Sequence, residues 1–289
     1  MSYTTPVAGV LLNYRDAARS LRCIRSLQAD GVETIVVWDN SDDGGISAAT
    51  LSSELSRDPG VHITGTGQNL GFAAGVNRAL EVISRLSPGC VALIINNDAV
   101  LLSGGRRAML AVLERDPATM MVAPWINHAG TTLGMGYYQR LTGLLSWHSR
   151  IGSFPYASGC CLLVNPRLAS SPLFDESFFM YGEDWELGWR LSKEFPGSIV
   201  QAPGVWVEHE GSASSRNGSL FYETSMVAAH LRLVRHLASP GLAYFALSGA
   251  RLIFLSCRAL VRSVRARSLV PLKGLVGGVG QVMMRRGVP

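Results

Sequence analysis

The sequence lacks the cysteine spacing of a disulfide framework or of a cysteine zinc site. Its five cysteines include the neighbours Cys160 and Cys161 but no pair separated by two residues. Small secreted folds rely on evenly paired cysteines, so this usage predicts reduced thiols and a cytoplasmic protein. The first six residues also lack a basic segment followed by an apolar one, and we therefore predict no export signal.

Two further absences narrow the class of function. The first apolar segment, residues 7–12, is followed by Asn13-Tyr14-Arg15-Asp16 rather than by a glycine-rich turn. A dinucleotide-binding dehydrogenase needs glycines at that place, because its backbone must approach the pyrophosphate closely. No compact segment interleaves basic with aromatic residues, so no nucleic-acid partner is expected.

The composition is that of a chain that folds around a large core. Of its 289 residues, 47% are hydrophobic and 16% are charged, and the formal net charge is +5. The basic excess is concentrated toward the C-terminus rather than spread evenly. That distribution favours an anionic membrane surface over nucleic acid as the charged partner.

Short apolar runs alternate with helical periodicity, which predicts an α/β fold. The expected strands are 7–12, 34–38, 61–64, 91–95, 120–124, 157–164 and 199–207. The expected helices lie around 21–27, 79–83, 106–115 and 183–191, and segment 125–154 is expected to be a loop. Such alternation is typical of a doubly wound, mostly parallel sheet flanked by helices.

One strand end in this pattern is unusually polar. The run Val91–Ile95 stops at Asn96-Asn97-Asp98, and in open α/β sheets ligands lie beyond the carboxyl ends of the strands. Asp98 is therefore expected to face a cleft. The alternative is that Asn97 and Asp98 cap a following helix, as short polar residues after a strand often do.

Several polar segments follow one another in a recognisable order. They are Leu12-Asn13-Tyr14, Val37-Trp38-Asp39-Asn40-Ser41, the segment from Asn69 to Asn77, Asn96-Asn97-Asp98, the segment from Phe174 to Leu187, and His209. In this order and spacing, residues 7–215 resemble the inverting family 2 glycosyltransferases of the GT-A fold, and within them the bacterial rhamnosyltransferase-like branch. The resemblance implies a GT-A-type catalytic domain over 1–215, with a nucleotide-sugar half (1–124) and an acceptor half (125–215). A basic helical extension (216–289) would follow.

The resemblance implies a nucleoside-diphosphate sugar, dTDP- or UDP-linked, as the donor. The positions that match family residues around the base, ribose and diphosphate are Asn13, Tyr14, Asp39, Asn69, Gly71, Asn77, Asn96 and Asn97. Asp39 would accept the imide N–H of a pyrimidine, since an ionised carboxylate only accepts hydrogen bonds. The alternative for Asp39 is a turn-forming aspartate before Asn40 and Ser41.

A divalent cation, Mn²⁺ or Mg²⁺, is the implied cofactor. Asp98 matches the acidic position of the family's Asp-X-Asp-like motif, whose first acid is replaced here by Asn96. A hard cation shares diphosphate oxygens and needs few protein ligands, so one carboxylate suffices. By the same resemblance His209 adds a nitrogen ligand, which favours Mn²⁺. The alternative is a strand-end histidine that only hydrogen bonds to its neighbours.

The resemblance also assigns the catalytic carboxylates. Asp184 would remove the proton from the acceptor hydroxyl, and Glu183 would orient or hydrogen bond beside it. The alternative is that both acids only complement the N-terminus of the helix that they open. Trp185 and Trp189 could stack on sugar, although their helical spacing favours core packing for at least one of them.

The implied activity is inverting, metal-dependent transfer of a sugar, best matched by rhamnose from dTDP-rhamnose. The acceptor would be a hydroxyl of a cell-surface glycan, such as lipopolysaccharide, or of a lipid-linked molecule. The alternative is a catalytically inactive nucleotide-sugar-binding or regulatory module. The joint presence of Asp98, Asp184 and His209 favours the enzyme. A homo-oligomer is compatible with both.

The last part of the chain is predicted to form helices, with breaks at Ser239-Pro240-Gly241 and near Pro271. Within residues 242–264, arginines interrupt every uncharged run before it reaches about 18 residues, so no membrane span is expected.

These arginines lie on one stripe of a helix, formed by Arg251, Arg258, Arg262 and Arg265. The stripe predicts a helix on the inner face of the plasma membrane, with its basic side toward anionic headgroups. The alternative is that the stripe packs on the catalytic domain or on a second subunit.

Overall fold

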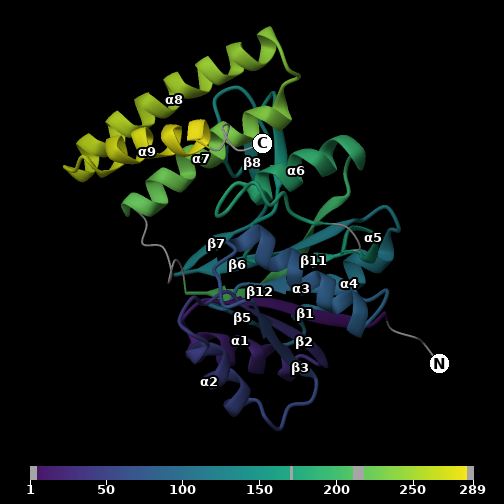
Figure 1. Ribbon diagram of the computed structural model, residues 1–289. Helices are drawn as coiled ribbons and strands as arrows, with labels where there is room; N and C mark the ends of the chain where they lie inside the picture. Colours follow the sequence, from purple (N-terminus) through teal and green to yellow (C-terminus); the bar gives the residue numbers. More distant parts are fainter. Residues whose placement is uncertain (1–4, 170–171, 211–217, 285–289) are drawn as a thin grey trace.

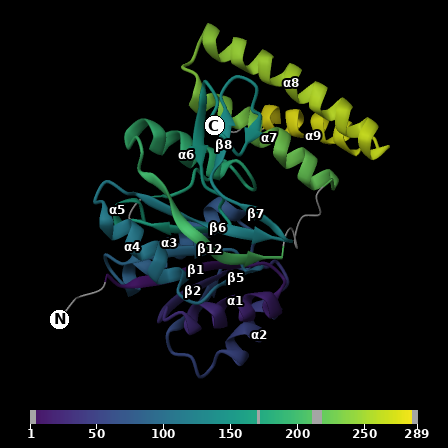
Figure 2. The same cartoon turned by 180° about the vertical axis from the view of Figure 1, so that it is seen from behind.

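The computed structural model describes residues 5–169, 172–210 and 218–284. A large sheet with helices on both faces forms the lower part of the molecule, and three long C-terminal helices lie beyond it (Figure 1). The same arrangement is seen from behind in Figure 2.

The strands are β1 (Val7–Asn13), β2 (Thr34–Asp39), β3 (Val61–Gly65), β4 (Val91–Ile95), β5 (Ala99–Leu101), β6 (Met121–His128), β7 (Thr131–Leu133), β8 (Gly136–Gln139), β9 (Leu145–Ser146), β10 (Ser153–Tyr156), β11 (Cys161–Val164) and β12 (Ile199–His209). The helices are α1 (Ala17–Ala29), α2 (Ile46–Glu54), α3 (Phe72–Leu86), α4 (Gly105–Arg115), α5 (Pro166–Ala169), α6 (Glu183–Glu194), α7 (Leu220–Leu237), α8 (Leu242–Ala266) and α9 (Val270–Met284).

The large sheet is mixed, with the strand order β3-β2-β1-β4-β11-β6-β12-β5 and β7 paired to β6. Strands β1, β2, β3 and β4 are parallel, while β11 runs antiparallel between β4 and β6. The predicted α/β fold with flanking helices and a C-terminal helical part is confirmed. Because β1, β2 and β4 point the same way, the polar residues that follow them meet at one edge of the sheet.

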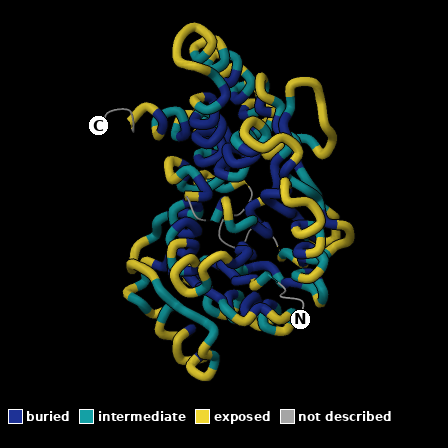
Figure 3. Tube along the Cα trace, turned by 90° about the vertical axis from the view of Figure 1, so that its right-hand side faces the viewer, coloured by how far each residue is buried: buried dark blue, intermediate teal, exposed yellow. Residues whose placement is uncertain are grey.

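The apolar runs are continuous because helices cover both faces of the sheet. On β1, Val7 and Leu11 pack into the cluster formed with α1, whereas Ala8 and Val10 pack into the cluster formed with α3. Side chains alternate across a strand, so a strand buried on both sides needs an apolar residue at every position. The burial-coloured trace shows buried segments through the middle of the molecule and exposed turns at its outer edges (Figure 3).

The expectation of a loop over residues 125–154 is wrong. Strand β6 continues to His128, and β10, β8 and β9 form a second, antiparallel sheet. Its inward side chains Tyr138, Phe154 and Tyr156 are buried against Trp185 of α6. The strands are only two to four residues long, too short for their alternation to stand out among the glycines. Helix α2 and strand β5 were likewise not expected from the sequence, and β11 begins later than predicted.

The C-terminal breaks are confirmed, but the predicted orientation of the arginine stripe is wrong. Arg251 is fully buried, and Arg258 and Arg262 donate hydrogen bonds to the carboxylate of Glu223 on α7. A buried carboxylate is stable only when it is paired, so Glu223 draws the arginines inward. Of the four arginines, only Arg265 is exposed. The alternative considered above, a stripe packed on the protein, therefore describes the structure.

Candidate active site

A cavity of ≈ 610 Å³ opens beyond the carboxyl ends of β1, β2 and β4, within the usual size range for small-molecule sites. Its walls combine polar residues from these strand ends with apolar residues from the segment before α6 and from α7. They are Leu12, Tyr14, Arg15, Asp16, Arg19, Asn40, Asn69, Phe72, Asn96, Asn97, Asp98, Phe179, Met180 and Phe221.

Asp98 is buried in this wall and faces His209 at the end of β12. Asp98 Oδ1 and His209 Nε2 are 3.1 Å apart, and the backbone N–H of Glu210 donates to the carbonyl of Asp98. The chain after Asp98 enters β5 rather than a helix, and α4 begins only at Gly105. The helix-capping interpretation of Asn97 and Asp98 is therefore wrong.

His209 is held from its other side by a residue that sequence reasoning missed. The Nδ1 atoms of His128 and His209 are 2.9 Å apart, so one ring donates a proton to the other. Burial and the neighbouring His209 lower the pKa of His128, which favours a neutral ring. His128 lies at the end of β6, in register with His209 on β12. Only this strand pairing brings the two rings together.

The donor atoms of Asp98 and His209 suit a divalent cation. Bonds of about 2.1 Å at right angles would separate two adjacent ligands by about 3 Å, which matches the observed spacing. No group of three or more His, Cys, Asp or Glu side chains placed to hold a metal occurs in the described part of the chain. A cation on this pair would therefore take its remaining ligands from a diphosphate and water.

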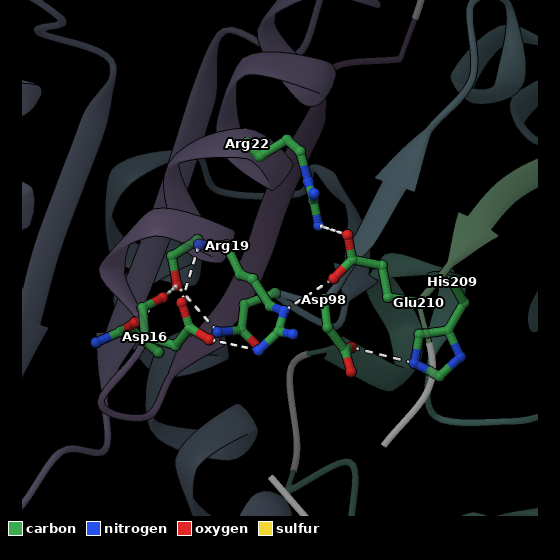
Figure 4. Close-up of polar contacts among 9 residues, drawn as sticks. Asp16, Arg19, Arg22, Asp98, His209 and Glu210 are labelled. Carbon is green, nitrogen blue, oxygen red and sulfur yellow. Dashed lines mark hydrogen bonds and ion pairs between the residues drawn. The ribbon is translucent and has the colours of Figure 1, made fainter. Parts of the chain in front are cut away.

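A cluster of charged residues fixes the strand end that carries His209 (Figure 4). Glu210 accepts from Arg19 Nε at 2.9 Å and is also paired with Arg22, both on α1. Arg19 in turn pairs with Asp16, the residue that caps α1. Exposed ion pairs contribute little singly, but this network joins β12 to α1 beside Asp98.

Asn13 at the C-terminal end of β1 and Asp39 at the C-terminal end of β2 form a buried hydrogen-bond network with Ser41. Asp39 Oδ1 accepts from Asn13 Nδ2 at 2.8 Å, from Ser41 Oγ at 2.7 Å and from the Ser41 backbone N–H. Asn13 is completely buried and also accepts from Ser20. Asn13 therefore positions Asp39 and does not line the cavity, so its contact with nucleotide stays a prediction. The contact from the Ser41 backbone is the turn bond considered as an alternative for Asp39.

Asp39 is buried and does not itself line the cavity, although the next residue does. All of its hydrogen bonds converge on Oδ1, and Oδ2 accepts none from the residues that the structure describes. Asn40, which sequence reasoning did not select, lines the cavity and donates to the carbonyl of Gly71 at 2.8 Å. Its position next to Asp39 at a strand end was the available signal.

The segment at the start of α3 joins the cavity to the loop before α6. Asn69 lines the cavity and accepts from the Gly71 backbone N–H. Gly71 has a φ of 82°, and a Cβ there would lie 2.3 Å from the carbonyl oxygen of Phe179, so only glycine fits. Asn77 is buried and exchanges hydrogen bonds with the backbone of Phe174. It does not line the cavity, and its contact with nucleotide stays a prediction.

Glu183 and Asp184 open α6, close to but outside the wall of this cavity. Burial raises the pKa of both carboxyls well above the ordinary range, and the charge of Asp184 raises that of Glu183 further. The Trp185 backbone N–H donates to Asp184 Oδ1 at 2.9 Å. Glu183 Oε2 is buried without a hydrogen-bond partner among the described residues. Because the two buried acids are adjacent, ionisation of one disfavours ionisation of the other.

The tryptophans of α6 serve packing. Trp185 is buried among Tyr138, Tyr156 and His230. Trp189 donates from Nε1 to the His236 carbonyl.

Of the predicted site residues, the structure gathers Tyr14, Asn69, Asn96, Asn97 and Asp98 at one cavity, with His209 touching Asp98.

The model of "Glycosyl transferase family 2" matches residues 10–170, which is more than half of the chain and includes the cavity residues from β1 to β4. The chain belongs to glycosyl transferase family 2. Among curated proteins, this family member is similar to the N-acetylglucosaminyl-diphospho-decaprenol L-rhamnosyltransferase of Mycobacterium tuberculosis (strain H37Rv). The two are 25% identical over 221 residues, 65% of this chain and 70% of the relative.

Solved GT-A glycosyltransferases share its fold at 12% sequence identity. GalNAc-T7 with UDP, GalNAc and Mn²⁺ superposes with a TM-score of 0.62 over 88% of this chain, which spans 55% of that protein. The mannosyltransferase PcManGT from Pyrobaculum calidifontis, in complex with GDP-Man and Mn²⁺, superposes with a TM-score of 0.57 over 98% of this chain and 88% of its own. TarS 1–349 of S. aureus gives 0.55 over 97% and 91%. The predicted GT-A fold is confirmed.

Proposed function

We propose that this family 2 member is an inverting, metal-dependent glycosyltransferase. It moves rhamnose from dTDP-rhamnose to a hydroxyl of a cell-surface glycan or a lipid-linked acceptor. The observation that carries the proposal is Asp98 in the cavity wall at the end of β4, with His209 Nε2 3.1 Å away. The choice of rhamnose and of a lipid-linked acceptor is supported by the mycobacterial relative, whose name specifies L-rhamnose transfer and a diphospho-decaprenol.

The residues that face the cavity have the chemistry that a nucleoside-diphosphate sugar requires. Tyr14 offers a ring for the base. Asp39 does not line the cavity but adjoins its wall residue Asn40, and its Oδ2 would be the acceptor for a pyrimidine N–H. Asn69, Asn96 and Asn97 supply amide donors and acceptors toward ribose and diphosphate. Residues 1–215 would form the catalytic unit and 216–289 its extension, and the protein would work on the cytoplasmic side of the plasma membrane.

Asp98 and His209 would hold the Mn²⁺ or Mg²⁺ ion. Bound there, the cation would neutralise negative charge that develops on the departing diphosphate. Glu210, locked by Arg19 and Arg22, keeps the end of β12 in place for this contact.

Asp184 would take the proton of the acceptor hydroxyl while that oxygen attacks the anomeric carbon from the side opposite the diphosphate. Its raised pKa makes the ionised carboxylate a stronger base than an exposed aspartate. Glu183 would remain protonated at neutral pH, because its pKa is raised by burial and by Asp184, and would donate a hydrogen bond beside the acceptor. A single displacement from the opposite side inverts the configuration of the anomeric carbon.

A panel of nucleotide sugars tests the proposal directly. We expect dTDP-rhamnose with Mn²⁺ to raise the melting temperature and to be hydrolysed slowly without an acceptor. The same panel with EDTA is the matched control. Stabilisation by a nucleotide sugar without any hydrolysis or transfer would identify the inactive binding module instead, and no response to any member would overturn the proposal.

The turnover rate should depend on pH through Asp184. Burial raises the pKa of this carboxyl to about 7, so the base is protonated and inactive below that pH. We expect the rate to fall about tenfold per pH unit on the acid side of this pKa, as for a single required ionisation. The measurement is kcat against pH with saturating donor. A rate that stays level down to about pH 5, where an ordinary aspartate is still ionised, would contradict the assignment.

His128 should set the tautomer of His209. If His209 Nε2 faces the cation it carries no proton, so its Nδ1–H must donate to His128 Nδ1. His128→Phe is expected to weaken Mn²⁺ binding by about 10–100-fold, the usual cost of removing such an outer partner. Titration of free Mn²⁺ by electron paramagnetic resonance measures this without turnover. The exposed His148→Phe is the control, and equal affinities in the two variants would exclude the role.

A further inference from the structure

Helix α8 turns its apolar face outward. Leu242, Phe245, Ile253, Leu260 and Val264 recur at helical spacing, and between half and nearly nine-tenths of each side chain is exposed. Burying the arginines against α7 leaves this opposite face without a charged residue. By length and composition, α8 is the one helix among the described residues that could cross a membrane. Only 17% of its most apolar 18-residue stretch is buried inside the protein.

A second apolar surface lies beside α8. Strand β9 and the turns that join it to β8 and β10 expose Leu141, Leu144, Leu145, Trp147 and Ile151, the last of them at 99%. These turns are far from α8 in sequence, but Arg251 of α8 donates to the carbonyl of Arg140 at 2.6 Å. Both ribbon views show the hairpin of β8 at the same end of the molecule as α8 (Figures 1 and 2).

Neither α8 nor the β8–β10 hairpin, which carry the exposed apolar side chains, contains an acidic residue. None occurs between Asp116 and Asp175, and none follows Glu223. Exposed basic side chains accompany the apolar ones, with Arg140 and Arg150 on the hairpin and Arg265, Arg267 and Lys273 around the end of α8. Exposed aliphatic side chains, a tryptophan and surrounding positive charge match the boundary between the hydrocarbon and the headgroups of an anionic bilayer.

We infer that the outer face of α8, together with the turns of β8–β10, is a membrane-docking surface that inserts apolar side chains into an anionic bilayer. The insertion is interfacial, because Arg251, Arg258 and Arg262 stay hydrogen bonded within the protein. The sequence predicted that the arginine side of this helix faces the membrane, whereas here its apolar side does. The inference deepens the membrane location in the proposed function and does not depend on the sugar or on catalysis.

A second copy of the chain fits the surface less well than a bilayer. Pairing two such faces would bring their exposed arginines together without an acidic partner from the same segments, and like charges across an interface oppose association. An anionic leaflet covers the apolar side chains and neutralises the surrounding arginines at the same time.

Flotation of the full-length chain with liposomes tests the inference. One variant carries Phe245→Gln, Ile253→Gln and Leu260→Gln on α8, and a second carries Trp147→Ser and Ile151→Ser on the hairpin. The control carries Ile46→Gln and Leu86→Gln, which are exposed apolar residues of α2 and α3 in the part of the molecule that contains the large sheet (Figure 1). Vesicles of phosphatidylcholine alone and with phosphatidylglycerol separate apolar insertion from charge attraction, and circular dichroism verifies the fold of each variant.

We expect the wild type and the control to float with anionic vesicles and, more weakly, with neutral ones. Each surface variant should lose about tenfold or more of its vesicle affinity. The substituted glutamine and serine side chains gain no free energy from moving out of water into the bilayer, as the apolar side chains do. Equal flotation of the variants and wild type, or no flotation of the wild type, would overturn the inference. So would a lipid-free dimer that the variants abolish, or resistance of the full-length protein to alkaline extraction, which would indicate a second copy or a membrane span. None of these results requires an active enzyme, so they are independent of the donor screen.

Discussion

Asp184→Asn is expected to lower kcat by about 10²–10⁴-fold, the usual contribution of a general base. Asparagine has nearly the shape of aspartate and can still accept the hydrogen bond from the Trp185 backbone, so α6 should begin as before. It cannot accept a proton from the acceptor hydroxyl at neutral pH. Affinity for the nucleotide and for Mn²⁺, measured by calorimetry, should stay unchanged, because Asp184 does not line the nucleotide cavity.

Two companion variants make this result specific. Glu194→Gln removes an exposed carboxylate at the other end of α6 and should leave kcat unchanged. Glu183→Gln keeps a hydrogen-bond donor in place of the protonated acid and should cost less than Asp184→Asn. If Asp184→Asn turns over normally while Glu183→Gln is inactive, Glu183 is the base and the assignment made here is wrong.

Asp98→Ala should abolish metal-assisted donor binding and lower turnover by about 10²-fold or more, since a metal supplies several kcal/mol of charge stabilisation. Asp98 is the only carboxylate of its motif, and Asp16, the other acid in the cavity wall, is already paired with Arg19. Its side chain ends in the cavity wall rather than in the apolar clusters, and the melting temperature without metal should therefore change little. The two measurements are the Mn²⁺ dependence of nucleotide binding by calorimetry and the turnover rate.

Glu194→Ala is the control for removing a carboxylate without touching the cavity. Loss of Mn²⁺-dependent nucleotide affinity in Asp98→Ala alone would support the cation site. Full activity of Asp98→Ala, or of the wild type in excess EDTA, would show that no cation acts through this residue.

The elements that position the cavity were predictable because their information is local. Apolar runs marked β1, β2 and β4, and each ended in polar residues that a strand end brings to one edge of the sheet. Asp98 was therefore expected at a ligand site, and the family resemblance added Tyr14 and Asn69; all three line the cavity. The end of α7 and the start of α9 could likewise be located from Pro240 and Pro271.

The role of each polar side chain depended on partners that are distant in sequence. Asn13 and Asn77 belong to the same motifs as the cavity residues, yet Asp39 and the backbone of Phe174 occupy their hydrogen-bonding groups. His128 reaches His209 only because β6 and β12 pair in register. No local pattern records such pairings, because they are set by which strands become neighbours.

The sequence by itself determined the alternation of strands and helices, the polar strand ends and the amphipathic character of α8, since each depends on residues a few positions apart. Only the tertiary structure decided which side of α8 faces the protein. A carboxylate buried on α7, Glu223, must be paired, and it holds Arg258 and Arg262 inward while the apolar side chains stay exposed. Burial of a charge costs more than exposure of a few apolar side chains, so one distant carboxylate reversed the orientation that periodicity alone predicts.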